Sequence, residues 1–275
     1  MRSLSHRASI KHLKSTLTSL RHLLETSLST KYIAETLDSF EEGTDSIVIH
    51  EHMAQRDFDV AGISRRGRTI GFVERDELKA KGVTASLRRF ATSDCLNSSD
   101  PISSALRVLE TGARAWVRAS GDVTGIVTRG DLQKAPVRMW LFATVSLLEM
   151  QLLRIVREQY RDDLWTPLIS DSRRAKANQL LRMKQRHNEA IDLADCLQIA
   201  DKATIVIKTD GMLAYLGFAE FRKGREAFER IERLRNSLAH SQDIVKGDAS
   251  NLARVVRETE ELLSRCERWS ATVRV

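Results

Sequence analysis

One segment in the first half joins a short apolar strand to a polar turn and reads Val123-Thr-Gly-Ile-Val-Thr-Arg-Gly-Asp-Leu132. Its β-branched residues favour an extended strand, and the glycine near its end favours a turn into a helix. A shorter apolar run, Ala115-Trp-Val-Arg118, and a Ser120-Gly-Asp122 turn come directly before it. A helix-like stretch from Pro101 to Leu109 precedes both. The sequence therefore predicts the order helix, strand, turn, strand and helix start.

The same order occurs once before along the chain. A helix-like stretch begins at Asp45, and the strand Phe58-Asp-Val-Ala-Gly-Ile63 follows it. A Ser64-Arg-Arg-Gly67 turn then leads into Thr69-Ile-Gly-Phe-Val-Glu-Arg-Asp-Glu-Leu78. A supersecondary unit that appears twice in this way indicates an internal repeat. The first half is therefore predicted to be an α/β region built from two copies.

This repeat resembles the cystathionine-beta-synthase (CBS) domain, which pairs two copies and commonly binds adenosine compounds. The resemblance covers about 30–134, with a degenerate first copy at about 30–82 and a second at about 83–134. It rests on Gly125-Ile-Val-Thr128-Arg-Gly-Asp131, which matches glycine, two apolar residues, Thr or Ser, two variable residues and Asp. The resemblance implies that Gly125, Thr128 and Asp131 bind an adenine nucleotide or other adenosine compound, such as AMP, ATP or S-adenosylmethionine, with no metal required.

The spacing of Thr128 and Asp131 suits a nucleotide. A hydroxyl at the end of a strand can reach a phosphate near the start of the next helix, where backbone N–H groups favour anions. A carboxylate in the first helical turn can accept hydrogen bonds from ribose hydroxyls. The alternative is that Thr128 or Asp131 only caps the helix that follows the strand.

The first copy differs at the same two positions, where Glu74 and Glu77 stand in place of Thr128 and Asp131. A carboxylate at the phosphate position repels a phosphate unless a cation lies between them. We therefore expect one nucleotide site per chain, in the second copy, and a structural role for the first.

The second half has the pattern of an all-α domain over about 136–270. Helices are predicted over Val137 to Tyr160, Arg173 to Ile199, Leu213 to His240 and Asn251 to Arg268. Short connectors between them favour an antiparallel four-helix bundle. The predicted fold class is therefore mixed: an α/β pair followed by a helical bundle.

An amphipathic helix is predicted within 1–29, from about Arg7 to Leu28. Its apolar residues recur at alternating steps of three and four, which places them on one helical face. Packing on its own chain or on a sister subunit is the expected role, and membrane binding is the alternative.

The last half also contains Leu234-Arg235-Asn236-Ser-Leu-Ala-His240. The same Arg and His spacing also occurs at Arg7 with His12 and at Arg182 with His187, so the spacing alone is not specific. A polar Asn236, flanking leucines and a position near the end of a helix distinguish this pair. In these respects it resembles the HEPN superfamily of helical bundles. The resemblance implies a metal-independent endoribonuclease with Arg235, Asn236 and His240 as catalytic residues.

The chemistry fits cleavage of RNA by attack of the ribose 2′-hydroxyl. A histidine can move a proton at neutral pH, and an arginine can stabilise charge on phosphoryl oxygens. Positions five apart on a helix lie about 140° apart with about 7.5 Å of rise, so a second subunit is expected to complete the site. Alternatively, Arg235 pairs with Glu232 or Glu149, and His240 caps the helix.

Composition limits the remaining choices. The formal net charge of +7 permits RNA binding without indicating it. Three cysteines far apart and no apolar leader favour a reducing cytoplasm, and the apolar stretch from Met139 to Leu153 contains Glu149 and Gln151, so no membrane span is expected. We expect a homodimer that acts on RNA rather than DNA, in a toxin-like or defence role. The rival hypothesis is a non-catalytic sensor whose helices serve dimerisation or partner binding.

Overall fold

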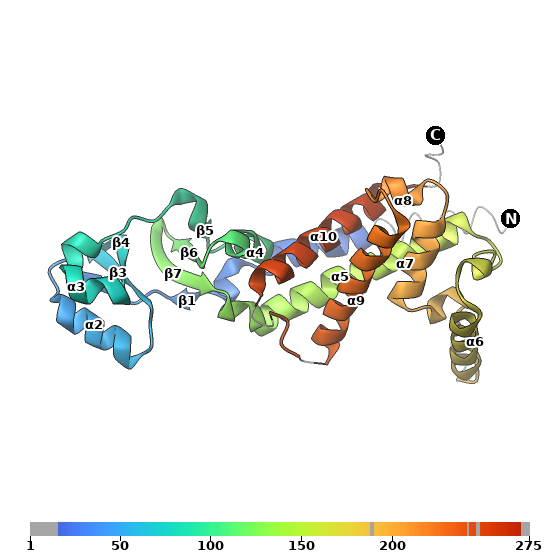
Figure 1. The fold of residues 1–275 in the computed structure, drawn as a ribbon, viewed down its shortest axis with the longest axis horizontal. Coiled ribbons are helices and arrows are strands. Elements are labelled where there is room, and N and C mark those ends of the chain that lie inside the picture. The colour runs from blue at the N-terminus through green and yellow to red at the C-terminus, as the bar shows by residue number, and fades with distance from the viewer. Residues whose placement is uncertain (1–15, 188–189, 241, 246–247, 271–275) are drawn as a thin grey trace. The chain divides into compact units, whose positions relative to one another are not determined.

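The computed structural model describes residues 16–187, 190–240, 242–245 and 248–270 (Figure 1). The chain divides into two compact units. The sheet unit comprises the described residues of 25–137 and 247–253, and the helical unit comprises those of 1–24, 138–246 and 254–275. The mixed α and β composition that the sequence predicts is confirmed.

The sheet unit contains the predicted repeat. The first copy runs β2 (Ser39–Glu41), α2 (Ser46–Gln55), β3 (Val60–Arg65), β4 (Arg68–Glu74) and α3 (Arg75–Ser86). The second runs β5 (Cys95–Asn97), α4 (Ile102–Thr111), β6 (Arg114–Ala119), β7 (Asp122–Thr128) and the 3-10 turn η3 (Gly130–Gln133). Two further 3-10 turns, η1 (Thr30–Tyr32) and η2 (Thr92–Asp94), precede the first strands of the copies.

Strand pairing is the same in both copies. β2 pairs parallel with β3, and β3 pairs antiparallel with β4; β5, β6 and β7 repeat this pattern. A further strand, β1 (Glu35–Thr36), pairs antiparallel with β7 and extends the second sheet to the order β1-β7-β6-β5. Because β1 precedes the first copy, the N-terminal end of the pair becomes part of the second copy's sheet.

The two hairpin turns explain the sequence signal between the strands. Arg66 and Gly67 have φ of 53° and 74°, and Ser120 and Gly121 have φ of 52° and 91°. Two consecutive residues with positive φ make the turn whose twist matches that of the flanking strands. Glycine adopts this conformation without strain, and it stands second in both turns.

A shared apolar cluster joins the two copies. Its buried members are Leu37, Phe72, Trp116 and Val123, and Phe90 packs against them. The ring of Phe72 lies 4.5 Å from that of Trp116 and 5.7 Å from that of Phe90, within the range for favourable aromatic pairs. Each copy therefore depends on the other for part of its core.

The helical unit contains α5 (Ala135–Gln159), α6 (Asp171–Gln185), α7 (Ile199–Lys208), α8 (Met212–Tyr215), α9 (Phe221–Ala239) and α10 (Ala249–Arg268). Two 3-10 turns, η4 (Thr166–Leu168) and η5 (Ala194–Cys196), lie in its connections. Polar contacts tie the long helices together: Arg230 of α9 pairs with Glu258 of α10 at 2.7 Å, and Arg154 of α5 donates to the carbonyl oxygen of Cys266 at 2.7 Å.

Two of the predicted helices are wrong in extent. The stretch from Arg173 to Ile199 is not one helix, because Gln198 and Asp201 form a capping box that starts α7 anew. The stretch from Leu213 to His240 is divided into α8 and α9, since Gly217 adopts a φ of 85° after α8. The predicted bundle of four long helices is therefore not confirmed in this region.

The N-terminal helix packs on its own chain where it is described. Residues 16–27 are helical, whereas residues 7–15 of the predicted helix lie outside the described residues. Leu17 is fully buried, and Arg21 pairs with Glu267 of α10 at 2.6 Å. The described part of this helix thus belongs to the helical unit.

One helix among the described residues, α5, is long and apolar enough to cross a membrane by length and composition. Much of its apolar surface is already buried in the protein. Arg154 is 1% exposed and donates to Gln151 and Glu158 within the same helix. Burial in the fold therefore accounts for the apolar character of α5.

Candidate functional site

A cavity of about 710 Å³ lies in the sheet unit beside the turn from Thr128 to Asp131. Both copies and the segment before them form its wall. Its lining residues are Glu35, Thr36, Leu37, Asp38, Arg56, Asp57, Phe58, Asp59, Val60, Ala113, Arg114, Ile126, Thr128, Arg129, Gly130 and Asp131. Thr128 and Asp131, which the sequence singles out, therefore lie together at a real cavity.

Asp131 is the most heavily bonded group at this cavity. It is 7% exposed, and its Oδ2 accepts hydrogen bonds from the backbone N–H of Thr128 at 2.7 Å and from the Thr128 hydroxyl at 3.0 Å. Its Oδ1 lies 2.8 Å from Nζ of Lys134. Neither the Thr128 nor the Asp131 side chain caps η3, whose N-cap is Arg129, and the bonds of Asp131 instead hold the Thr128 hydroxyl and the carboxylate in one fixed arrangement.

Lys134 connects this turn to the other end of the sheet unit. Its Nζ donates to the carbonyl oxygen of Ile33 at 2.7 Å and pairs with the Glu35 carboxylate. Burial acts to lower the pKa of Lys134, but its hydrogen bonds to Asp131 and Glu35 outweigh burial and hold that pKa above its ordinary value. The ammonium group therefore stays charged, and Asp131 keeps a cation as its neighbour.

The remaining cavity wall offers both charge and apolar surface. Arg56, Arg114 and Arg129 supply guanidinium groups, which suit phosphate oxygens. Leu37, Val60, Phe58 and Ile126 supply apolar surface that suits the face of a purine. The cavity wall therefore offers groups that suit a flat ring and groups that suit anions.

Gly125 has a backbone role. It is not among the cavity-lining residues, and it pairs with Thr36 where β1 joins β7. A Cβ at this position would lie 3.1 Å from the carbonyl oxygen of Glu35, closer than most such contacts. The glycine of the motif therefore lets β1 approach β7, and its contact with a ligand stays a prediction.

The first copy shows what replaces a ligand at the corresponding place. Arg88 donates to Glu74 at 3.2 Å and also pairs with Glu77. Arg114 lies 3.4 Å from Glu74 and 5.8 Å from the centre of the Phe72 ring. Arginine side chains of the chain itself therefore balance these two carboxylates.

In the helical unit, Arg235, Asn236 and His240 all lie on the exposed side of the last turn of α9. Arg235 donates to the side-chain oxygen of Asn236 at 3.3 Å. His240 occupies the C-cap, where its backbone N–H donates to the carbonyl oxygen of Asn236 at 3.1 Å. Glu149, one alternative partner for Arg235, instead pairs with Lys202 at 2.7 Å.

Arg138 and Lys134 were missed from the sequence. Arg138 of α5 donates to the carbonyl oxygens of Ser237 and Leu238 at 3.3 and 3.2 Å, and it thereby satisfies the open end of α9 beside His240. Its partners lie about a hundred positions away, so no local pattern reveals it. Lys134 did have a local signal, since it follows Asp131 by three positions.

No metal-binding group was found in the described ranges. Within residues 16–187, 190–240, 242–245 and 248–270, no cluster of three or more His, Cys, Asp or Glu side chains is placed to hold a metal ion.

No family model matches the chain, and no curated protein matches it. Solved structures of CBS-domain proteins are similar to part of it. CbpB in complex with c-di-AMP is 12% identical, with 46% of this chain and 95% of that chain covered and a TM-score of 0.36. CBSX2 in complex with AMP is 19% identical, with 41% and 98% covered and a TM-score of 0.34. The CBS domain of the bacterial CNNM/CorC family Mg²⁺ transporter in complex with ATP is 13% identical, with 44% and 94% covered and a TM-score of 0.34.

Proposed function

We propose that the sheet unit binds one adenosine ligand per chain, at the cavity beside Thr128 and Asp131, and that this ligand controls RNA cleavage by the helical unit. The observation that carries the first part is the cavity itself. Its volume of about 710 Å³ falls within the range of small-molecule sites, and its wall combines apolar and charged side chains. An adenine nucleotide or other adenosine compound is also the ligand class that the CBS resemblance implies.

Each part of such a ligand has a matching group. The Asp131 carboxylate is an acceptor for ribose hydroxyls, in exchange for its present bonds to Thr128. Arg129 and Arg114 can neutralise phosphates, and Ile126 with Val60 can contact the ring. Five carboxylates, those of Glu35, Asp38, Asp57, Asp59 and Asp131, also line the cavity, so a ligand with one or two phosphates suits it better than a more highly charged one.

The proposal for the helical unit rests on an arginine whose charge is left available. The hydrogen-bond partner of Arg235 is a neutral amide, and no carboxylate of the described residues lies within ion-pair distance of it. Such a guanidinium can bind a phosphate of RNA. His240 would take the proton of the 2′-hydroxyl as that oxygen attacks phosphorus, and it would return this proton to the 5′-oxygen as the bond from phosphorus to that oxygen breaks.

A homodimer would complete this site. Arg235 and His240 are exposed on one helix end, but they point about 140° apart around the axis. Two copies related by a two-fold axis would place the arginine of one chain near the histidine of the other. Control by the ligand requires that it favour one arrangement of the subunits over another.

The nuclease proposal is tested on purified protein with structured and single-stranded RNA in EDTA. AMP, ATP and S-adenosylmethionine are added in turn, and Arg235→Ala and His240→Ala are run beside the wild type. We expect cleavage whose rate changes with one nucleotide and falls at least about a hundredfold in either variant. Cleavage that persists in both variants would show a contaminating nuclease.

A separate titration tests the sensor. Calorimetry with the same nucleotides should give one site per chain, and Asp131→Asn should weaken it at least about tenfold. Nucleotide binding without RNA cleavage under any condition would favour the rival function, a non-catalytic sensor whose helices dimerise or bind a partner. Absence of nucleotide binding would end the sensor proposal.

A further inference from the structure

The helix α6 is a basic surface helix. Among its 15 residues, Ala177 is the one that is buried. Its basic residues are Arg173, Arg174, Lys176, Arg182 and Lys184; Arg186 follows at the C-cap, and Asp171 is its acidic residue. A helix that buries so little apolar surface is not explained by the core of its unit.

The N-terminal end of α6 is fixed to α7. Arg173 donates to both carboxylate oxygens of Asp201, at 2.6 and 2.9 Å, and to Gln198 at 2.6 Å. The charge of Arg173 is therefore used within the fold. Figure 1 shows the C-terminal half of α6 projecting from the helices α5, α9 and α10.

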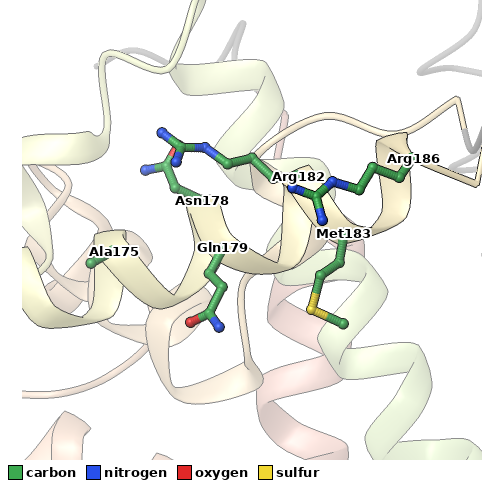
Figure 2. Close-up of a pocket in the computed structure, with 6 residues that line it drawn as sticks. All are labelled: Ala175, Asn178, Gln179, Arg182, Met183 and Arg186. Atoms are coloured by element: carbon green, nitrogen blue, oxygen red, sulfur yellow. The ribbon is translucent and has the colours of Figure 1, made fainter.

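One face of this half carries Asn178, Arg182 and Arg186 at steps of four, which places them in a row along the helix. Figure 2 shows the two arginine side chains running back along α6, with Arg182 reaching Asn178. They border a hollow of about 650 Å³ whose described wall also includes Met183, which is 52% exposed. No carboxylate of the described residues lies within 4.0 Å of either guanidinium.

We propose that this α6 face, defined as Asn178, Arg182, Met183 and Arg186, binds the backbone of single-stranded RNA, as a substrate track for the site at Arg235 and His240. The inference rests on the proposed nuclease function. Arg182 and Arg186 are about 6 Å apart along the helix axis, far enough for their guanidinium groups to contact different phosphates of one strand. Each guanidinium can therefore bind a phosphate, while Met183 offers apolar surface to a base.

The base of α6 lies near the proposed catalytic end of α9. Arg173 pairs with Asp201 of α7 at 2.6 Å, and α7 packs against α9. The hydrogen bond to Asp201 is the main reason that the pKa of Arg173 is above its ordinary value, and the charge of Glu232 on α9 adds to it. Glu232 precedes Arg235 by three positions, which is almost one helical turn. From Arg173, the rise to Arg186 is about 20 Å, enough to contact several phosphates of a strand.

The test measures binding of a 2′-O-methyl RNA oligonucleotide, which this chemistry cannot cleave, by fluorescence anisotropy with the full-length protein. We expect Arg182→Gln with Arg186→Gln to weaken binding about tenfold or more. The slope of log K against log salt should become shallower by about 1.4, since each phosphate contact on a single strand contributes about 0.7. Arg182→Lys with Arg186→Lys should keep the slope.

The matched control is Arg222→Gln with Arg225→Gln, which removes the same charge from α9, where both arginines pair with glutamates one turn away. An equal loss in this control, or no loss in the α6 variant, would overturn the proposal. Binding of the wild type to phosphatidylserine vesicles, but not to RNA, would do so too, because the face would then be a membrane contact.

Failure of the proposed nuclease gives a different result. His240→Ala should bind the oligonucleotide as the wild type does, so RNA that is bound through α6 but never cleaved would remove the nuclease and leave the α6 face in place. If Arg182→Gln with Arg186→Gln cleaves and binds RNA as well as the wild type does, the proposed role of the α6 face is rejected and the proposed nuclease function is retained.

Discussion

The two copies of the sheet unit share their strand pairing and turns, yet they carry side chains of opposite charge at one matching strand position. In the second copy, Asp131 is the acid after the strand, and Glu35 stands on the strand that pairs beside it. In the first, Glu77 is the acid and Arg88 stands at the matching strand position, opposite Phe72. In the first copy Arg88 balances the acids within the chain, and in the second copy Lys134 does so, because it pairs with both Asp131 and Glu35. The fold is common to both copies, and these side chains are where the two copies differ.

The first prediction tests whether the two copies form one cooperative structure. Trp116→Ala removes a ring that contacts Phe72 and Phe90 in the cluster shared by both copies. We expect a loss of about 3 to 5 kcal/mol in the free energy of unfolding, because the cavity left in a packed core cannot close fully. Denaturant titration by circular dichroism measures it, and hydrogen exchange should rise in both copies.

The matched control is Ile47→Ala, which truncates an exposed apolar side chain in the same unit and should change stability by less than about 0.5 kcal/mol. Faster exchange confined to the second copy would show that the copies are independent.

The second prediction makes the competent copy resemble the other. Thr128→Glu should weaken nucleotide binding by about a hundredfold, equivalent to about 2.7 kcal/mol, because a carboxylate then faces the phosphate. Thr128→Ser keeps the hydroxyl and should bind within a few-fold of the wild type. Calorimetry reads both, and tight binding in the glutamate variant would contradict the placement of the phosphate.

The third prediction makes the inert copy resemble the competent one. Glu74→Thr, Glu77→Asp and Arg88→Glu together should raise the nucleotide stoichiometry from one to two per chain, with the new site about tenfold weaker. It is expected to be weaker because the first copy has Val60 opposite Glu74, where the competent copy has Arg114 opposite Thr128. A stoichiometry that stays at one would mean that the cavity wall, and not these three side chains, excludes the ligand.

The smallest effect concerns pH. Desolvation acts to raise the pKa of Glu77, but hydrogen bonds from Lys81 and Arg88 outweigh it and hold that pKa below 4.5. A carboxyl whose pKa is lower in the folded state stabilises the fold at pH values above its unfolded-state pKa. This contribution is lost as the pH falls through the folded-state pKa. In Arg88→Ala, the pKa of Glu77 should rise toward 4.5, as an NMR titration of the carboxyl carbon would show. An unchanged titration would show that Arg88 does not lower the pKa of Glu77.

The repeat could be predicted because its signals are local. The glycines of the turns and the spacing of Thr128 and Asp131 can be read from a few neighbouring residues, and the structure places both side chains at one cavity. The opposite wall could not be predicted, since Glu35 and Arg56 reach the cavity from the other copy and from the segment before it. Sequence order alone does not show which distant segments meet.

The helical unit was predicted less well, because a polar helix and a polar loop have similar amino-acid sequences. The run from Arg173 to Ile199 keeps a helical charge pattern, yet its end contains Gln198 and Asp201, whose three-residue spacing was the available sign of a new start. The position of Arg235 to His240 at the end of a helix is confirmed. Their catalytic role stays a prediction.

The contact between Lys134 and Ile33 has a practical consequence. With β1 paired to β7, it places the entry and exit of the sheet unit beside each other. A module with adjacent ends can be inserted into a surface loop of a reporter protein, or closed head to tail and reopened at the Arg66 and Gly67 turn. The sheet unit is thus suited to serve as a transplantable biosensor that carries its cavity intact.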